Sequence, residues 1–88
     1  MEEAHREILR KKRVELLRDL DPCEDLYAYL MADDILTSEH REINLKKETR
    51  KERAEHLLDV LTRRGPRAFH ALLNALQHTQ PHLCHLLM

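Results

Sequence analysis

AEHLLDVLTRRGPRAFHALLNAL, the stretch of residues 54–76, predicts two amphipathic helices joined by a short turn. Its apolar side chains recur at intervals of three and four residues in each half, which is the period of a helix with one buried face. The positions concerned are Leu57, Leu58, Leu61, Phe69, Leu72, Leu73 and Leu76. We expect them to form the core. Gly65 is expected to end the first helix in a left-handed conformation, and Pro66 to begin the second at its first position.

The preceding part of the chain predicts two further helices. Residues 2–20 are expected to form one long helix that bends at the charged turn 10–13, because the apolar residues on either side fall on two displaced stripes. A bend there lets both stripes, the second of which includes Val14, face one core. Asp21-Pro22 ends this helix, since the residue before a proline avoids the α region. Asp21 is placed to cap a second helix that begins at Pro22.

A short third helix is expected from a cap at Thr37 to about Ile43, and a loop over residues 44–48 follows it. Thr49 and Glu52 have the spacing of a capping box, which predicts that the helix of the opening stretch begins there. A last short helix follows Pro81. Because no strand pattern is present, the expected class is an all-α domain of six helices.

Composition narrows the class of protein. The chain has 88 residues, of which 42% are hydrophobic and 35% charged, with one Gly and three aromatic residues. This balance excludes collagen, Pro/Gly-rich disorder and an aromatic-rich β-sandwich. The sequence has no apolar run long enough for a membrane span and no signal peptide before the charges that begin at Glu2, so a cytoplasmic location is expected. In that compartment Cys23 and Cys84 are expected to be free thiols.

Charge is strongly segregated along the chain although the net charge is only −1. Residues 21–45 carry one basic and seven acidic groups, whereas residues 46–67 carry eight basic and four acidic ones. Such segregation suits a protein that docks oppositely charged faces of similar molecules, because charge complementarity supplies orientation and specificity. An ordinary solvated surface is the alternative interpretation.

Other chemistries fit less well. His78, His82, Cys84 and His85 are zinc-compatible ligand types, but no paired Cys-x-x-Cys accompanies them and Pro81 interrupts the helical spacing, so neither a metal site nor a cofactor is expected. Neither cysteine lies in a catalytic signature, so enzymatic activity of this chain is not expected. A small helical nucleic-acid-binding domain that uses the basic segment Lys46–Arg53 is the alternative function, and the acidic stretch 21–45 opposes it.

Several segments in order resemble the caspase recruitment domain of the death-fold superfamily. They are HREILRKKRVEL at residues 5–16, DILT at 34–37, EIN at 42–44, LLDVL at 57–61, RGPRAF at 64–69 and NAL at 74–76. The joining segment RGPRAF resembles initiator caspase prodomains, and also the adaptor that couples such a caspase to a death-domain platform. The resemblance implies a six-helix antiparallel Greek-key bundle with a kinked first helix. We expect residues 1–88 to be a single domain excised from a longer protein, in which any protease domain lies elsewhere.

The resemblance also implies a function. Such a domain recruits and clusters apoptotic signalling proteins by homotypic docking, in which a basic face on the first and fourth helices meets an acidic face on the second and third. Carried onto this sequence, the basic face consists of Arg10, Arg13, Arg50, Lys51 and Arg53. The acidic face consists of Glu24, Asp25, Asp33, Asp34, Glu39 and Glu42. The implied partner is another caspase recruitment domain, in an initiator caspase, an adaptor, an apoptosome-type platform or a second copy of this chain, with no membrane involved.

Overall fold

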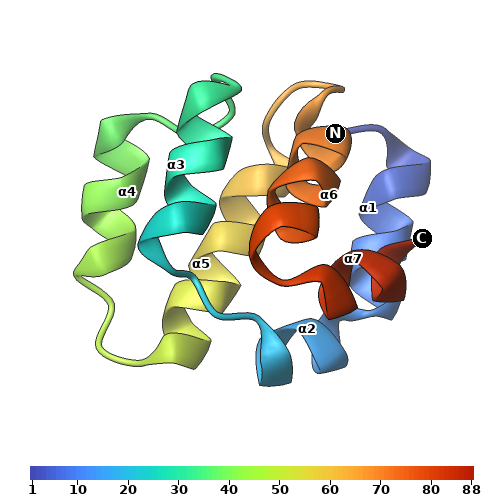
Figure 1. Ribbon diagram of the computed structural model, residues 1–88, viewed down its shortest axis with the longest axis horizontal. Coiled ribbons are helices and arrows are strands. Elements are labelled where there is room, and N and C mark those ends of the chain that lie inside the picture. The colour runs from blue at the N-terminus through green and yellow to red at the C-terminus, as the bar shows by residue number, and fades with distance from the viewer.

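Seven α-helices make up the regular structure of the chain, and the computed structural model describes all of residues 1–88 (Figure 1). In chain order they are α1 (Glu3–Lys11), α2 (Arg13–Asp19), α3 (Glu24–Ala32), α4 (Ser38–Leu45), α5 (Arg50–Thr62), α6 (Ala68–Thr79) and α7 (Pro81–Leu87). The expected all-α class is confirmed. None of these helices combines the length and the apolar character that crossing a membrane requires.

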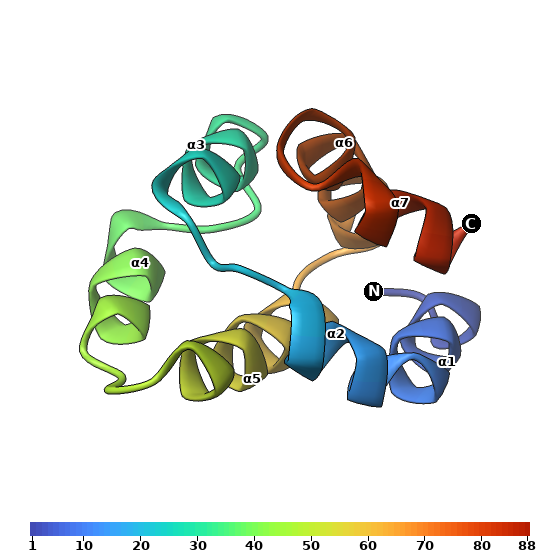
Figure 2. The ribbon, with the colours of Figure 1, turned by 60° about the horizontal axis from the view of Figure 1, so that its bottom comes forward.

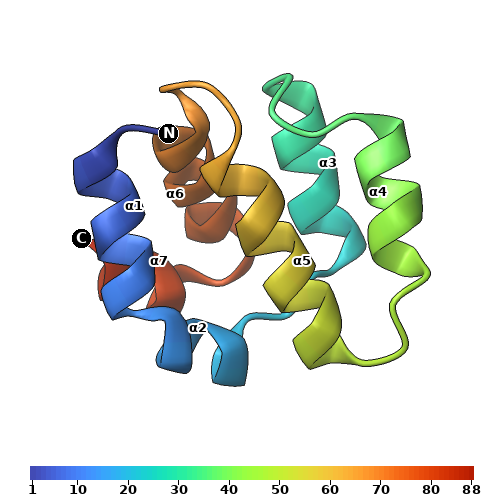
Figure 3. The same cartoon turned by 180° about the vertical axis from the view of Figure 1, so that it is seen from behind.

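The helices pack as a bundle with two sides. Figure 2 shows α3, α6 and α7 on one side and α1, α2 and α5 on the other. The packed pairs include α3 with α6, α6 with α7, α2 with α5 and α4 with α5. Seen from behind, α5 lies between α1 at one edge and α4 at the opposite edge (Figure 3). Helix α5 therefore lies between the two edges of the bundle.

The core is formed by the apolar stripes of the opening stretch. Twenty-two buried apolar residues make one continuous cluster. Of the seven expected core positions in residues 54–76, only Leu73 is half-buried, and the others are buried. Phe69 is 4% exposed, and its ring stacks on the imidazole of His5 in α1 with 4.3 Å between the ring centroids. This stacking ties the N-terminal helix to α6.

The N-terminal segment differs from its expectation. Two helices replace the single bent one, and Lys12 lies outside both with φ −100° and ψ 9°. Val14 was expected to lie in the core but is 75% exposed. In α2 the buried residue is Leu16, two positions away, and two residues turn the helix by about 200°. Val14 therefore points to solvent on the face opposite Leu16.

A buried glutamine, rather than an aspartate cap, fixes the entry to α3. Asp21 was expected to cap this helix, but the N-cap residue is Cys23 and no side chain caps it. Instead the backbone N–H of Asp21 donates to Gln80 Oε1 at 2.9 Å, and Gln80 Nε2 donates to the Asp21 carbonyl at 2.8 Å. Gln80 is 8% exposed, so this pair of hydrogen bonds joins the α2–α3 connection to the start of α7 away from competing water.

The left-handed helix stop falls on Asp34 rather than on Gly65. Asp34 has φ 59°, whereas no glycine has a positive φ. At the end of α3 the N–H of Ile35 donates to the Leu30 carbonyl and the N–H of Asp34 to that of Met31. These two bonds define a Schellman motif, and aspartate is one of the few residues that tolerate the left-handed conformation it needs.

The α5–α6 connection is held by long-range hydrogen bonds. Helix α5 ends at Thr62, and α6 begins at Ala68, two residues later than the expected start at Pro66. Between them, the guanidinium Nε of Arg64 donates to the Ile35 carbonyl at 2.7 Å, and the Met1 ammonium group donates to the Arg64 carbonyl. Because these bonds fix the connection, it needs no left-handed glycine.

Both expected threonine caps are present. Thr37 caps α4 by accepting from the backbone N–H of His40, whose side chain reciprocates. Thr49 caps α5 by accepting from the backbone N–H of Glu52 at 3.0 Å. Its hydroxyl donates to the Glu52 carboxylate at 3.1 Å, so the second half of the expected capping box, a bond from the backbone of Thr49, is missing.

Replacing Phe69 with alanine removes a buried ring that α1 packs on, and we expect Phe69→Ala to lower the free energy of unfolding by about 3–5 kcal/mol. Val14→Ala is the control, because its side chain is exposed, and it should change the same quantity by no more than about 0.5 kcal/mol. Chemical denaturation followed by circular dichroism measures both. Equal stabilities of the two variants would remove Phe69 from the core.

Candidate protein interaction surfaces

The basic residues of α2 and α5 surround a shallow depression. Helices α2 and α5 pack against each other, and the depression between them, of about 240 Å³, is lined by five residues. These are Val14, Leu17, Arg18, Arg50 and Lys51. We call these five residues the α2–α5 surface. It combines an exposed apolar side chain with three cations, which is a composition suited to receiving a partner that carries carboxylates around an apolar contact.

Arg50 is held in place by the end of α2. Its guanidinium Nη1 donates to the carbonyl oxygens of Leu17 and Leu20 at 3.0 and 2.8 Å. The last carbonyls of a helix have no partner within the helix, and they carry the negative end of its dipole. Arg50 therefore joins α5 to α2 and keeps a positive charge at the centre of the α2–α5 surface.

Three of the other four expected basic residues, Arg10, Arg13 and Arg53, have partners inside the domain. Arg13 lies 3.7 Å from the carboxylate of Asp59, which links α2 to α5. Arg10 pairs with Glu7 one turn away, and this hydrogen bond lowers the pKa of the Glu7 carboxyl and raises that of Arg10. Arg53 donates to the Lys47 carbonyl at 2.9 Å, toward the α4–α5 connection. Lys51 alone among the expected five makes no hydrogen bond or ion pair within the domain.

The sequence-based prediction missed Arg18. Its side chain is 67% exposed and pairs with the adjacent Asp19, an interaction that lowers the pKa of the Asp19 carboxyl. A signal was present in the sequence, because Val14 and Arg18 are four residues apart on the helix face opposite the pair Leu16 and Leu20. The proximity of Lys51 could not be predicted, since it depends on how α2 packs against α5.

The acidic residues fall into separate groups. Asp25 lies in the first turn of α3, whereas Asp33 and Asp34 follow its last turn, at the far end of a nine-residue helix about 13 Å long. Glu39 and Glu42 are three residues apart on one face of α4, and both are exposed. None of these five carboxylates forms an ion pair within the domain.

Glu24 is the exception among the acidic residues. Arg41 of α4 donates to both carboxylate oxygens of Glu24, with N–O distances of 2.6 and 2.7 Å. This hydrogen bonding raises the pKa of Arg41, and it neutralises Glu24. The one basic residue in the acidic stretch thus clamps α4 to the start of α3, and Glu24 contributes less free negative charge than the sequence predicts.

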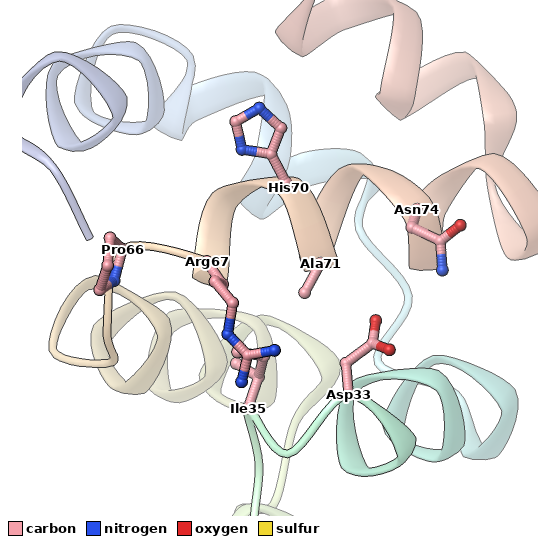
Figure 4. A pocket seen from close by; sticks show the side chains of 7 residues that line it. All are labelled: Asp33, Ile35, Pro66, Arg67, His70, Ala71 and Asn74. Carbon is pink, nitrogen blue, oxygen red and sulfur yellow. The ribbon is translucent and has the colours of Figure 1, made fainter.

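Asp33 also lines a second depression, of about 400 Å³, between the end of α3 and the start of α6 (Figure 4). The other lining residues are Ile35, Pro66, Arg67, His70, Ala71 and Asn74. Asp33 and Arg67 lie on different walls and form no ion pair. No local pattern in the sequence indicates this neighbourhood, because it joins residues 33–35 to residues 66–74.

A buried hydrogen-bond network positions α4. Asn44, 1% exposed, was expected in a loop but lies in the last turn of α4. Its Oδ1 accepts from the hydroxyl of Tyr27 in α3, while its Nδ2 donates to the Arg53 carbonyl at 2.9 Å and faces His56 Nδ1 at 2.8 Å. Burial raises the pKa of Tyr27 and, reinforced by Lys47 and His40, lowers that of His56. Both shifts favour the neutral forms that this network uses.

The thiols and histidines form no recognisable centre. Cys23 is half-buried and Cys84 buried, and neither is in a disulfide. No group of three or more His, Cys, Asp or Glu side chains is arranged to hold a metal ion.

An all-helical bundle that displays basic side chains along α2 and α5 and acidic ones along α3 and α4 is suited to protein–protein interaction. The family model of the caspase recruitment domain (CARD) matches residues 6–88. Caspase-2 of Gallus gallus is 36% identical over 89 residues, an alignment that covers 100% of this chain and 21% of the relative. The chain belongs to the caspase recruitment domain family. Its members are non-catalytic modules that bind other CARDs in caspase signalling and apoptosis.

Arg50 and Lys51 are adjacent on α5 but differ in their contacts, so they should differ in stability. We expect Arg50→Ala to lower the free energy of unfolding by about 1 kcal/mol, because it leaves the Leu17 and Leu20 carbonyls without their charged donor. Lys51→Ala, which removes no hydrogen bond or ion pair within the domain, should stay within about 0.5 kcal/mol of the wild type. Urea denaturation measures both, and equal stabilities would show that Arg50 does not support α2.

Proposed function

We propose that this chain is a non-enzymatic adaptor module that recruits and clusters apoptotic signalling proteins in the cytoplasm. Its α2–α5 surface docks on the acidic residues of a partner CARD, in an initiator caspase, an adaptor or an apoptosome-type platform. The observation that carries the proposal is the α2–α5 surface itself, in which Arg18, Arg50 and Lys51 surround the exposed Val14. Any protease activity associated with the module is proposed to belong to a domain outside residues 1–88.

Docking depends on an apolar contact surrounded by charge. Val14 supplies an exposed apolar side chain, and burying it against a partner excludes water from the neighbouring ion pairs. Arg50 is already oriented by the α2 carbonyls, so it loses little conformational entropy on binding. The Lys51 side chain forms no hydrogen bond or ion pair within the domain and is the cation with most to gain from a partner carboxylate. Arg10 and Arg13 are paired with Glu7 and Asp59 within the domain, so they contribute less free positive charge than Lys51.

The acidic residues form the complementary face. Glu39 and Glu42 on α4, with Asp25 on α3 and Asp33 and Asp34 after it, are free to meet the cations of another CARD. Helices α3 and α4, which carry or precede these residues, lie on the side of α5 away from α1 (Figure 3). A contact between unlike surfaces does not close on itself, so repeated docking extends into a chain of domains. Such an assembly concentrates attached proteases so that they activate one another.

The six-helix Greek-key bundle of the death fold belongs to the same proposal. Counting α1 and α2 as the two halves of one kinked helix converts the seven observed helices into six. The nucleic-acid alternative is opposed by the free negative charge of the domain. The acidic stretch 21–45 opposes phosphate binding, because the carboxylates of Asp25, Asp33, Asp34, Glu39 and Glu42 form no ion pair within the domain.

Reversing one charge on the α2–α5 surface tests the proposal. We expect Lys51→Glu to reduce capture of a CARD-containing protein from cytosolic extract by about tenfold or more, because it places a carboxylate opposite the partner's carboxylates. The matched control is Arg63→Glu, an exposed cation without a partner that follows the last residue of α5, about 18 Å from Lys51. Mass spectrometry identifies and quantifies the captured protein.

Equal loss in both variants would show that total charge, not the α2–α5 surface, governs binding. Capture that both variants retain would exclude this surface. If the wild type captures no CARD-containing protein but binds duplex DNA, the nucleic-acid alternative replaces the proposal.

Docking through exposed charges should also depend on salt. The screening length falls from about 10 Å at 0.1 M salt to about 3 Å at 1 M, so attraction between the two surfaces weakens across that range. We expect capture of the partner CARD to decrease steadily as sodium chloride is raised between these limits. Capture that does not change with salt would count against a charge-dependent mechanism.

A further inference from the structure

We propose that Thr49 is a phosphorylation site, and that its phosphate switches off the α2–α5 surface. The second half of this inference rests on the proposed function. Thr49 is exposed and lies in the irregular connection between α4 and α5, directly before the residues Arg50 and Lys51 of that surface. A protein kinase that selects basic residues upstream of its target is the class of enzyme that this segment fits.

Thr49 is singled out by its upstream neighbours. The chain has five serine and threonine residues, which are Thr37, Ser38, Thr49, Thr62 and Thr79. Only Thr49 has lysines two and three residues before it, at Lys47 and Lys46. Kinases discriminate among substrates by such charge patterns. Thr62 and Thr79 are moreover half-buried in helices, where their hydroxyls donate to backbone carbonyls.

Thr37 provides an internal comparison. Both Thr37 and Thr49 are exposed N-cap residues, and each accepts a hydrogen bond from a backbone N–H three residues later. Their surroundings carry opposite charge, because Asp34 lies three residues before Thr37 whereas Lys46 lies three residues before Thr49. A kinase that selects upstream basic residues therefore distinguishes two hydroxyls that have the same local geometry.

The chemical step is a phosphoryl transfer from ATP. The Thr49 hydroxyl oxygen attacks the γ-phosphorus, the bond between that phosphorus and the bridging oxygen of ADP breaks, and the hydroxyl proton passes to the kinase's base. In the unmodified domain this hydroxyl donates to the Glu52 carboxylate at 3.1 Å. Glu52 is exposed, so its side chain has room to turn away from the new negative charge.

The phosphate would change the charge of the surface. Residues 46–53 contain five basic and two acidic groups, and a phosphothreonine adds a charge of about −1.5 to −2. Five basic and two acidic groups give a net local charge of +3, so the phosphate cancels about half to two thirds of it beside Arg50 and Lys51. The added phosphate also repels the carboxylates of an approaching CARD. Docking at the α2–α5 surface is therefore weakened both by the loss of attraction and by the new repulsion.

The modification is tested by treating the domain with ATP and the catalytic subunit of the cyclic-AMP-dependent protein kinase, which selects upstream basic residues. We expect mass spectrometry to find phosphate on Thr49 and not on Thr37, and Thr49→Asn to abolish incorporation. Phosphate on both threonines, or none on Thr49, would overturn the assignment.

The effect on docking is tested with a matched pair of variants. Thr49→Asp and Thr49→Asn place side chains of nearly equal size and capping ability at the N-cap, and they differ by one negative charge. We expect phosphorylated wild type to capture about tenfold less of the CARD-containing protein identified with the wild type, Thr49→Asp to lose a smaller part, and Thr49→Asn to keep full capture.

Two further outcomes separate the proposals. If phosphorylated Thr49 leaves capture unchanged while Lys51→Glu abolishes it, the switch is wrong and the docking surface stands. If Lys51→Glu retains full capture, the docking proposal fails, and the phosphate on Thr49 then has no such surface to switch.

Discussion

The hydrogen bonds of Asn44 are the interaction on which the acidic side of this domain depends. Helix α4 buries one residue, and that residue is an asparagine rather than an apolar side chain. Tyr27 from α3 and the Arg53 carbonyl and His56 from α5 satisfy its amide, and Arg41 adds a second clamp by binding Glu24. A helix with so little apolar surface is held by polar contacts, and a buried amide that lost them would be costly.

On the opposite side, the break at Lys12 determines what the domain displays. Because α2 begins anew at Arg13, it buries Leu16 and turns Val14 outward. Arg50 then joins the end of α2 to α5, which brings Val14, Arg18 and Lys51 around one depression. An apolar residue that a continuous stripe would have buried thus becomes part of the exposed surface.

Local patterns predicted most of the helices. The spacing of Leu57, Leu61 and Phe69 located the core, and Thr37 located a helix start, because both features depend on neighbours in sequence. The predictions failed where contacts with segments distant in the sequence determine the backbone conformation. Gly65 is not left-handed, since the connection after α5 is tied to Ile35 and Met1, and Asp34 provides the left-handed turn instead.

The sequence identifies which segments carry basic and acidic residues, but it does not show which of these side chains have partners inside the domain. Arg10, Arg13 and Arg53 have partners inside the domain, whereas Lys51 has none, and only tertiary packing decides this.

Helix α5 contacts both the basic α2–α5 surface and the acidic helix α4. Its first turn carries Arg50 and Lys51 of the α2–α5 surface, and the Arg53 carbonyl and His56 on the same helix hold α4, which carries Glu39 and Glu42. The orientation of one surface relative to the other is therefore set by a single helix and its hydrogen bonds, not by a flexible connection. Under the proposed docking mode each added domain repeats the same rotation, and a constant rotation between unlike surfaces that do not close produces a helical assembly instead of an irregular aggregate.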